Sequence, residues 1–220
     1  MITRAMFLCA LFYMSPSLAD WPDVPSLPNS KIERIGEEVR LNGVPMRMQR
    51  VLNKRKPAEV IDFYRTALGS KHVVEKIPGG LLLAQGQGTY FLTIRIRAIS
   101  PSWTETLVSI SDARLAREAA NRPLGFPIPA DTQVLSDMES LDSGKASRHL
   151  VLTNSHSVDT NVQFLTNTLR ARGYNLHASE TQKLATGRVL MFGGDKREAR
   201  LVVLRKNDSS NVVLTTIQTP

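Results

Sequence analysis

The chain of 220 residues has a single cysteine, Cys9. It lies in an apolar stretch near the start, and Leu8 precedes it where a lipid-anchor signal would have glycine or alanine. If this stretch is removed as a signal peptide, the mature chain has no cysteine, so it forms no disulfide bond in an oxidising compartment and has no zinc site built on thiolates. The fold must therefore be stabilised by an ordinary hydrophobic core.

Long hydrophobic runs are also missing. The apolar stretch from Ala5 to Met14 is about ten residues long, whereas a transmembrane helix needs about twenty. Arg4 precedes it, and Ser17 and Ala19 follow at the positions of a small-residue cleavage site. These features predict a signal peptide at 1–19, export to the periplasm and no transmembrane segment after cleavage. The alternative is an uncleaved anchor, which the short apolar run disfavours.

Motifs that carry catalytic chemistry are missing as well. The histidines show no metal-ligand spacing, the glycine pairs lie between expected strands, and there is no G-x-S-x-G sequence. We interpret His156, between Ser155 and Ser157, as part of a helix cap and turn, because a Ser–His hydrolase also needs an orienting acid. The sequence predicts no enzyme, no cofactor and no metal. An enzyme of unrecognised type is the alternative, and a pocket that brings His149 or His156 to carboxylates would favour it.

Acidic residues are fewer than basic ones, 20 against 28, which gives a net charge of +8. Loss of Arg4 with the signal peptide leaves +7. This balance favours an anionic partner, such as a lipid head group or an anionic polymer, although a basic surface can also serve solubility alone. Export and the lack of a nucleic-acid-binding motif argue against nucleic acid. The candidate contacts to an anionic partner are Lys54, Arg55, Lys56, Arg95, Arg97, Lys196 and Arg197.

A repeat at an offset of 101 residues is the most informative pattern that is present. The Asn42-Gly43 turn recurs as Ser143-Gly144, and Arg47 recurs as Arg148. Asn-Gly is a strong hairpin signal because both central residues of a type I′ turn need positive φ. The other matches pair Leu27-Pro28 with Ile128-Pro129, and Ile61, Phe63, Tyr64 and Leu68 with Val162, Phe164, Leu165 and Leu169.

Each half shows the same order of expected elements: two strands, a helix, then three strands. Pro57 and Ser157 mark the helix starts, and Gly69 and Gly173 mark their ends. Short turns between the strands predict mostly antiparallel sheets. The expected strands are 32–41, 44–52, 81–85, 89–99 and 106–110 in the first half, and 132–140, 148–154, 188–192, 199–205 and 211–218 in the second.

The sequence therefore predicts an α+β fold of two tandem ββαβββ modules, each a mostly antiparallel sheet covered by one helix. Whether the modules pack into one body or sit apart on a linker is open at this point. The predicted divisions are an extended lead-in at 20–30, the first module at 31–112, a connecting helix and Pro-rich linker at 113–129, and the second module at 130–220.

The first helix carries a motif that is similar to one in known proteins. The segment from Lys56 to Leu68, with Val-x-x-Phe-Tyr-x-x-x-Leu, resembles a segment of exported Gram-negative proteins of unknown function. In those proteins glycine and an aromatic residue often follow, as Gly173-Tyr174 does here, whereas the first half has Gly69-Ser70 and the second has Phe164-Leu165 for Phe-Tyr. The element order also resembles the helix-grip modules of outer-membrane assembly lipoproteins, which are protein-docking domains. The resemblance implies the fold and an envelope location, and no catalytic residues.

We therefore expect an exported, non-enzymatic binding or assembly module that belongs to an envelope complex. Exposed strand edges would allow pairing with another protein chain. The alternative is a binder of a small ligand or of an anionic envelope polymer, which would use the basic clusters and a groove between the halves.

Overall fold

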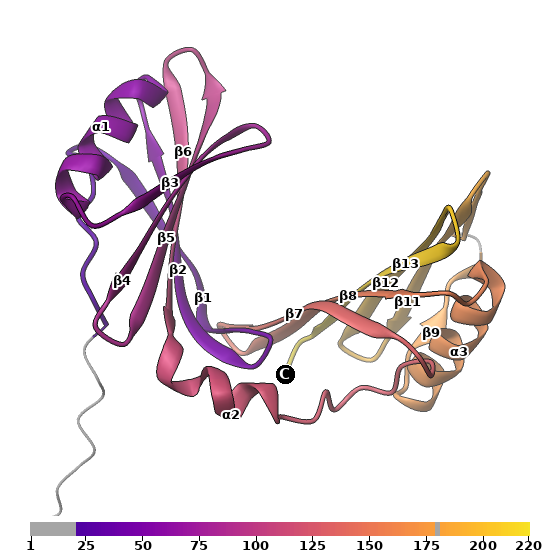
Figure 1. Ribbon diagram of the computed structural model, residues 1–220. Helices are drawn as coiled ribbons and strands as arrows, with labels where there is room; N and C mark the ends of the chain where they lie inside the picture. Colours follow the sequence, from indigo (N-terminus) through magenta and orange to yellow (C-terminus); the bar gives the residue numbers. More distant parts are fainter. Residues whose placement is uncertain (1–20, 179–180) are drawn as a thin grey trace, which may run out of the picture.

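The computed structural model describes residues 21–178 and 181–220, so the predicted signal peptide lies outside the described residues. The described chain has an α+β fold, with three α-helices and a sheet of thirteen strands (Figure 1). Every strand pair in the sheet is antiparallel. The prediction of an α+β chain with antiparallel pairing is thus confirmed.

The elements form two arms. The first arm contains β1 (Lys31–Leu41), β2 (Val44–Asn53), α1 (Pro57–Leu68), β3 (Val73–Ile77), β4 (Gly80–Gln87), β5 (Tyr90–Ser100) and β6 (Trp103–Asp112). A 3-10 turn (Ala113–Leu115) and α2 (Ala116–Ala120) lead to the second arm. That arm contains β7 (Gln133–Asp142), β8 (Lys145–Asn154), α3 (Val158–Ala171), β9 (Asn175–Leu176), β10 (Gln182–Leu184), β11 (Gly187–Gly194), β12 (Arg197–Lys206) and β13 (Ser209–Gln218).

The expectation of two separate sheets is wrong. Residues 38–41 of β1 pair antiparallel with residues 138–141 of β7, which joins the arms into one sheet. The strand order is β10-β11-β12-β13-β8-β7-β1-β2-β6-β5-β4-β3, and β9 pairs with β11 beside this path. The physical reason is that the first strand of each arm has a free edge, and joining the two edges satisfies their backbone groups.

Local sequence signals explain where the elements begin and end. Asn42 and Gly43 both have positive φ, as a type I′ hairpin turn requires. Pro57 begins α1, where its missing N–H leaves no bond unmade, and the Oγ of Ser157 accepts a hydrogen bond from the N–H of Thr160 at the start of α3. The predicted turn at Ser143-Gly144 has the same two positive φ values.

Three strands were not predicted from the sequence: β3, β9 and β10. β3 is an edge strand whose residues are mostly exposed, so it lacks the alternation of buried and exposed positions that identifies an inner strand. β9 and β10 contain two and three residues, which is too short for a pattern. They belong to the sheet through single neighbours.

Each arm has its own hydrophobic core between its helix and one face of the sheet. In the first arm, Tyr64 of α1 packs with Val51 and Ile94 of the sheet, and burial raises the pKa of Tyr64 to about 12. In the second, Leu165 of α3 packs with Leu152 and Leu201. The segments before each arm take part as well, because Trp21, Val24 and Leu27 cover the first core and Leu124, Phe126 and Ile128 cover the second.

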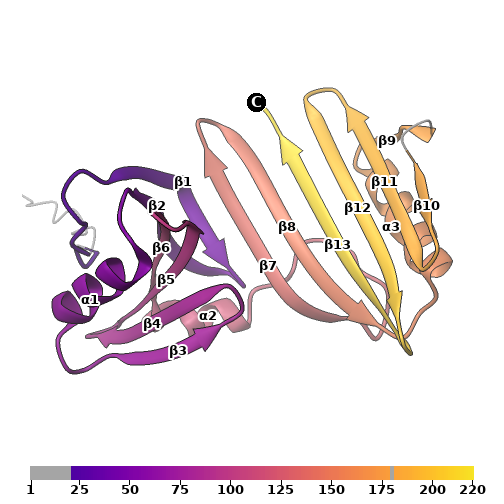
Figure 2. The same cartoon turned by 90° about the horizontal axis from the view of Figure 1, so that it is seen from above.

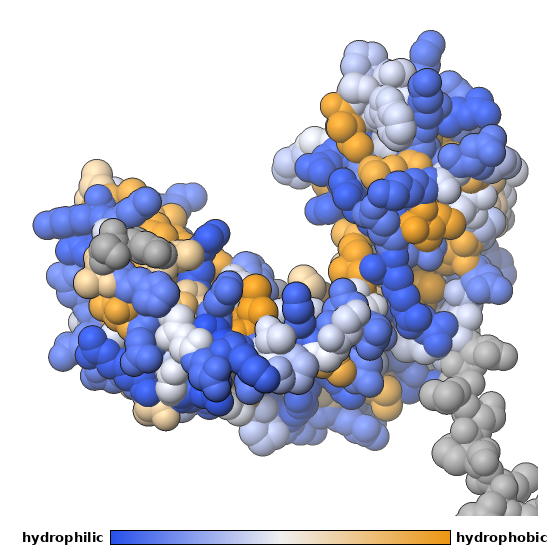
Figure 3. Space-filling view, turned by 180° about the vertical axis from the view of Figure 1, so that it is seen from behind, coloured by the Kyte–Doolittle hydropathy of each residue, from blue (hydrophilic) through white to orange (hydrophobic). Residues whose placement is uncertain are grey.

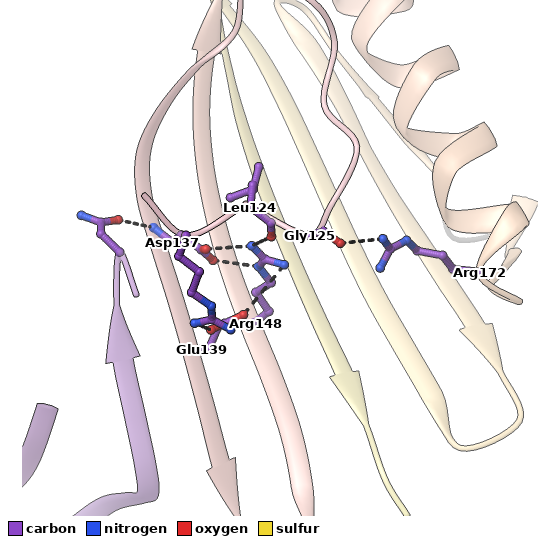
Figure 4. Close-up of polar contacts among 8 residues, drawn as sticks. Leu124, Gly125, Asp137, Glu139, Arg148 and Arg172 are labelled. Atoms are coloured by element: carbon purple, nitrogen blue, oxygen red, sulfur yellow. Dashed lines mark hydrogen bonds and ion pairs between the residues drawn. The ribbon is translucent and has the colours of Figure 1, made fainter. Parts of the chain in front are cut away.

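A polar network on the helix-bearing side fixes the joint between the arms (Figure 4). Arg148 of β8 donates two hydrogen bonds of 2.7 Å to the carboxylate of Asp137 and one of 2.6 Å to the carbonyl of Leu124. The side chain of Asn42, in the first arm, accepts a hydrogen bond of 2.9 Å from the N–H of Asp137. A largely buried bidentate pair therefore connects the strands of the second arm with the segment before them, and the N–H of Asp137 adds the turn of the first arm.

The single sheet bends at this joint, so that the arms enclose an open angle (Figure 1, Figure 2). Both α1 and α3 lie on the outside of the bend, and no helix of residues 21–178 and 181–220 covers the inside. We call the inside the concave face. Figure 3 shows it from behind as a hollow between the arms, with hydrophobic side chains among hydrophilic ones. No helix among the described residues is long and apolar enough to cross a membrane.

Candidate functional site

The concave face is built by every second residue of the strands, because side chains alternate between the two faces of a sheet. In β2 and β6, Val51 and Val108 belong to the first core, so Arg50 and Leu107 lie on the opposite, concave face. The same alternation places Val39 of β1 and Ser140 of β7 on this face, and these two residues are directly opposite each other across the joint. The concave face therefore continues from one arm to the other.

A row of valines crosses the concave face of the second arm. Val189 is opposite Val202, Val202 is opposite Val213, and Val213 is opposite Val151. All four are half-buried, although no helix of the described part of the chain covers them. The row runs across β11, β12, β13 and β8 and gives this arm an apolar strip.

The matching row of the first arm has different chemistry. It runs across β4, β5, β6 and β2 as Leu82, Arg95, Leu107 and Arg50. Two arginines thus stand where the second arm has valines. The row ends on β1 at Glu33, directly opposite Arg50.

An ion-pair ladder surrounds this row. Arg50 donates to Glu105 at 2.7 Å and to Glu33 at 3.3 Å, and Arg97 donates to Glu105 at 2.6 Å. Lys31 pairs with Glu33 at 2.6 Å. Burial raises the pKa of Glu105, but hydrogen bonds from the Arg50 and Arg97 guanidinium groups outweigh this and hold its pKa below the ordinary value.

The ladder leaves one arginine of the row without a carboxylate. Arg95 is exposed, and it forms no ion pair with any residue that the structure describes. Arg50 and Arg97 cover Glu105, which is 7% exposed. The concave face of the first arm therefore offers an uncompensated cation beside a satisfied network.

The predicted basic residues do not form one site. Arg95 and Arg97 lie on the concave face of the first arm, whereas Lys54, Arg55 and Lys56 are exposed in the connection between β2 and α1. Arg55 pairs with Glu59 at 3.3 Å, and its carbonyl accepts a hydrogen bond of 2.8 Å from the Thr104 hydroxyl, which ties this connection to β6 near Arg97.

The remaining pair, Lys196 and Arg197, lies in the other arm at the turn between β11 and β12. Lys196 donates to the carbonyl of Pro220 at 2.7 Å, and Arg197 donates to the carbonyl of Arg172. These two side chains thus hold neighbouring backbone segments. Five of the seven predicted residues thus lie in the first arm, in two separate places, and two lie in the second arm.

Exposed apolar side chains also gather on the concave face. Phe91 is 48% exposed, and its strand partners place it on the same face as Met46. The second arm contributes Leu204 and Ile217 in the same way. Isolated exposed apolar residues are ordinary, but a face that gathers them on both arms is typical of an interaction surface.

The histidines are held by local hydrogen bonds. His149 lies on the concave face, where its Nδ1 is 2.9 Å from the hydroxyl of Thr215. His156 contacts the carbonyl of Ala130 at 2.8 Å, outside this face. Neither contacts a carboxylate among the described residues. Within residues 21–178 and 181–220, no group of three or more His, Cys, Asp or Glu side chains is placed to hold a metal ion.

Sequence reasoning missed the valine row and Glu105. The valines come from four strands whose order in the sheet does not follow the chain, so only the ladder pairs them. The alternation of Val202 and Leu204 with buried neighbours was a usable signal that β12 has a second apolar face. Glu105 lies 55 residues from Arg50 in the sequence, and no local pattern connects them.

Comparisons of the chain with protein-family models, with curated proteins and with solved structures find no match.

Proposed function

We propose that this protein is an exported, non-enzymatic docking module of the periplasm, which binds a protein partner in an envelope complex through its concave face. The observation that carries the proposal is the continuous helix-free face, on which Phe91, Leu204 and Ile217 are exposed. A sheet usually buries its apolar face against another layer, so an uncovered apolar face indicates a surface that binds a partner. The signal-peptide pattern of the first residues supports the envelope location.

We also propose that the two arms arose by duplication of one ββαβββ module. The register of the joint supports this, because Val39 and the residue opposite it, Ser140, differ by the offset of 101 seen in the sequence. The neighbouring pairs, Glu38 with Leu141 and Arg40 with Glu139, exchange places under the same offset. The joint therefore has the register of a two-fold axis between like modules.

Glycines at matching places in the two arms support the duplication further. A Cβ on Gly80 would lie 2.1 Å from the carbonyl oxygen of Ile96, and one on Gly187 would lie 2.2 Å from that of Val203. Gly80 and Gly187 are 107 residues apart, and so are Ile96 and Val203. This offset is larger than 101 because the second arm has a longer segment between its helix and β11. Both arms thus need glycine at the start of the same strand for the same steric reason.

Purification of the tagged protein from cross-linked cells tests the docking proposal. Phe91→Ser removes an exposed apolar side chain from the concave face, and Phe164→Ser removes one of 36% exposure from α3 on the outside. We expect one envelope protein to co-purify with the wild type and with Phe164→Ser, and its yield to fall severalfold with Phe91→Ser. Recovery of the monomer alone, or equal losses in both variants, would contradict the proposal.

A second candidate is the binding of an anionic envelope polymer to the first arm. Arg95 favours it, because this exposed guanidinium has no ion-pair partner among the described residues. Such binding weakens steeply as salt rises, since exposed charges are screened. Salt-independent retention on an anionic polysaccharide column would exclude this candidate.

A further inference from the structure

A hollow on the concave face of the second arm has a volume of about 430 Å³. Met191, Arg200, Thr215 and Ile217 come to it from β11, β12 and β13, and His177 closes it beyond β9. An adjoining hollow of about 380 Å³ shares His177 and Ile217 with it. Together the two form one groove beside the valine row, two residues away along β11, β12 and β13.

Arg200 is the unusual group in this groove. Its Nε donates to the thioether sulfur of Met191 at 3.2 Å, which is a weak acceptor. No residue that the structure describes forms an ion pair with Arg200. Guanidinium groups bind carboxylates with two parallel hydrogen bonds, so the remaining donors of Arg200 fit such a head group.

The charged groups that line the groove give it a net positive charge, which favours an anion. Glu198 lies two residues before Arg200 on the same face of β12, and His177 lies beside it. Lys196 and Arg197 line the adjoining hollow. The guanidinium of Arg197 is held at the carbonyl of Arg172, on the helix side of the sheet. Two cations, Arg200 and Lys196, therefore face one carboxylate and one histidine, and the balance is positive.

An apolar track begins at Arg200. Val202 and Leu204 follow it on the concave side of β12, and Val189 and Val213 flank Val202 on either side. With a rise of about 3.3 Å per residue, the track from Arg200 to Leu204 is about 13 Å long. A charged head at one end and an apolar track beyond it match a carboxylate that carries an aliphatic chain.

We propose that the second arm binds an aliphatic carboxylate, with the head group on Arg200 and the chain along Val202 to Leu204. This site goes beyond the docking proposed above and does not depend on it. The first arm lacks the site, because Thr93 stands at the position of Arg200 and arginines 95 and 97 stand where the track would run.

Calorimetric titration of the full protein with dodecanoate below its micelle concentration tests the site. We expect saturable binding to one site, with Arg200→Gln and Val202→Thr each weakening it about tenfold or more. The first variant loses the charge-assisted hydrogen bonds to the head group, and the second places a hydroxyl group against the aliphatic chain. Arg65→Gln removes an exposed arginine from α1, on the outside of the other arm, and is the matched control, so it leaves the affinity unchanged. Unfolding curves of all three variants check that they fold.

Three further ligands separate the contributions of head and chain. Acetate has the head without the chain and dodecyltrimethylammonium has the chain with the opposite charge, so both should bind at least tenfold more weakly than dodecanoate. An apolar peptide with a free C-terminal carboxylate, compared with its amide, tests a protein source of the same head group. Equal binding of the cationic ligand, no effect of Arg200→Gln, or binding of the peptide acid without dodecanoate would overturn the proposal.

Discussion

The two arms share a backbone and differ on their concave face. The first arm presents Arg50 and Arg95 in the row where the second arm presents Val151 and Val202. Positions that the fold itself requires agree between the arms, as Gly80 and Gly187 do. The comparison teaches that steric and core positions constrain the module, whereas its helix-free row is free to change. We infer that the arms contact chemically different parts of a partner or ligand.

Arg47 and Arg148 are a matched pair that the arms use differently, and we expect the largest effect there. Arg148→Met should lower the free energy of unfolding by about 3 kcal/mol, because it leaves the buried Asp137 carboxylate unpaired. Arg47→Met should cost less than about 1 kcal/mol, since Arg47 only stacks on the Trp21 ring at 5.1 Å. Urea unfolding of both variants measures the difference. Equal losses of stability in the two variants would show that the Arg148–Asp137 pair stabilises the protein no more than the contact of Arg47 with Trp21.

The matched glycines should behave alike. Gly80→Ala and Gly187→Ala each place a Cβ against a backbone oxygen, so each should destabilise the protein by about 2 kcal/mol. Gly86→Ala is the control in the same strand as Gly80, because nothing lies within 4 Å of its Cβ position. Thermal unfolding measures all three. A large cost in only one arm would break the equivalence of the arms.

Glu105 should make the first arm sensitive to acid. Because its pKa in the folded protein lies below the ordinary value, its stabilising effect is complete above about pH 4.3 and is lost as the pH falls through the folded pKa. Glu105→Gln should cost about 1 kcal/mol at pH 7 and remove this part of the acid dependence, with Arg50 and Arg97 half-exposed. Unfolding at pH 7 and below pH 4 measures it. The same loss at both pH values would contradict the assignment.

Exchange of the row residues should have the smallest effect on stability. Arg95→Val and Val202→Arg swap the chemistry of directly matching positions, and each should change the free energy of unfolding by less than about 1 kcal/mol, since neither side chain belongs to a core. Binding should change instead. Binding of the variant with both changes to the envelope partner and to dodecanoate, each compared with the wild type, measures this effect. A large decrease in the free energy of unfolding from either change would show that the row residues stabilise the fold.

Local features of the fold were predictable from the sequence. Asn42-Gly43, Pro57 and Ser157 fix turns and helix starts through neighbouring atoms, and each occurs where the sequence indicates. The joint between β1 and β7 was not predictable, because it depends on which strand edges stay free after each arm has formed. The valine row required the order of β8, β13, β12 and β11, which long-range pairing decides.

The candidate site was only partly predictable for the same reason. The alternation of Arg95 and Arg97 with Ile94 and Ile96 indicates a charged face of one strand, and the structure places both arginines on the concave face. The neutralisation of the two arginines differs because Glu105, on the next strand, forms an ion pair with Arg97 and not with Arg95. Charge runs such as Lys54-Arg55-Lys56 show that residues are exposed, but not that they act together.

Site-specific photo-cross-linking in living cells tests the central claim most directly. A photoreactive phenylalanine analogue at Phe91 or Ile217 probes the concave face of each arm, and at Arg65 or Phe164 it probes the two outer helices. We expect cross-links to the same envelope protein from both concave positions and none from the helices. Cross-links from the helices alone, or from all four positions equally, would contradict it.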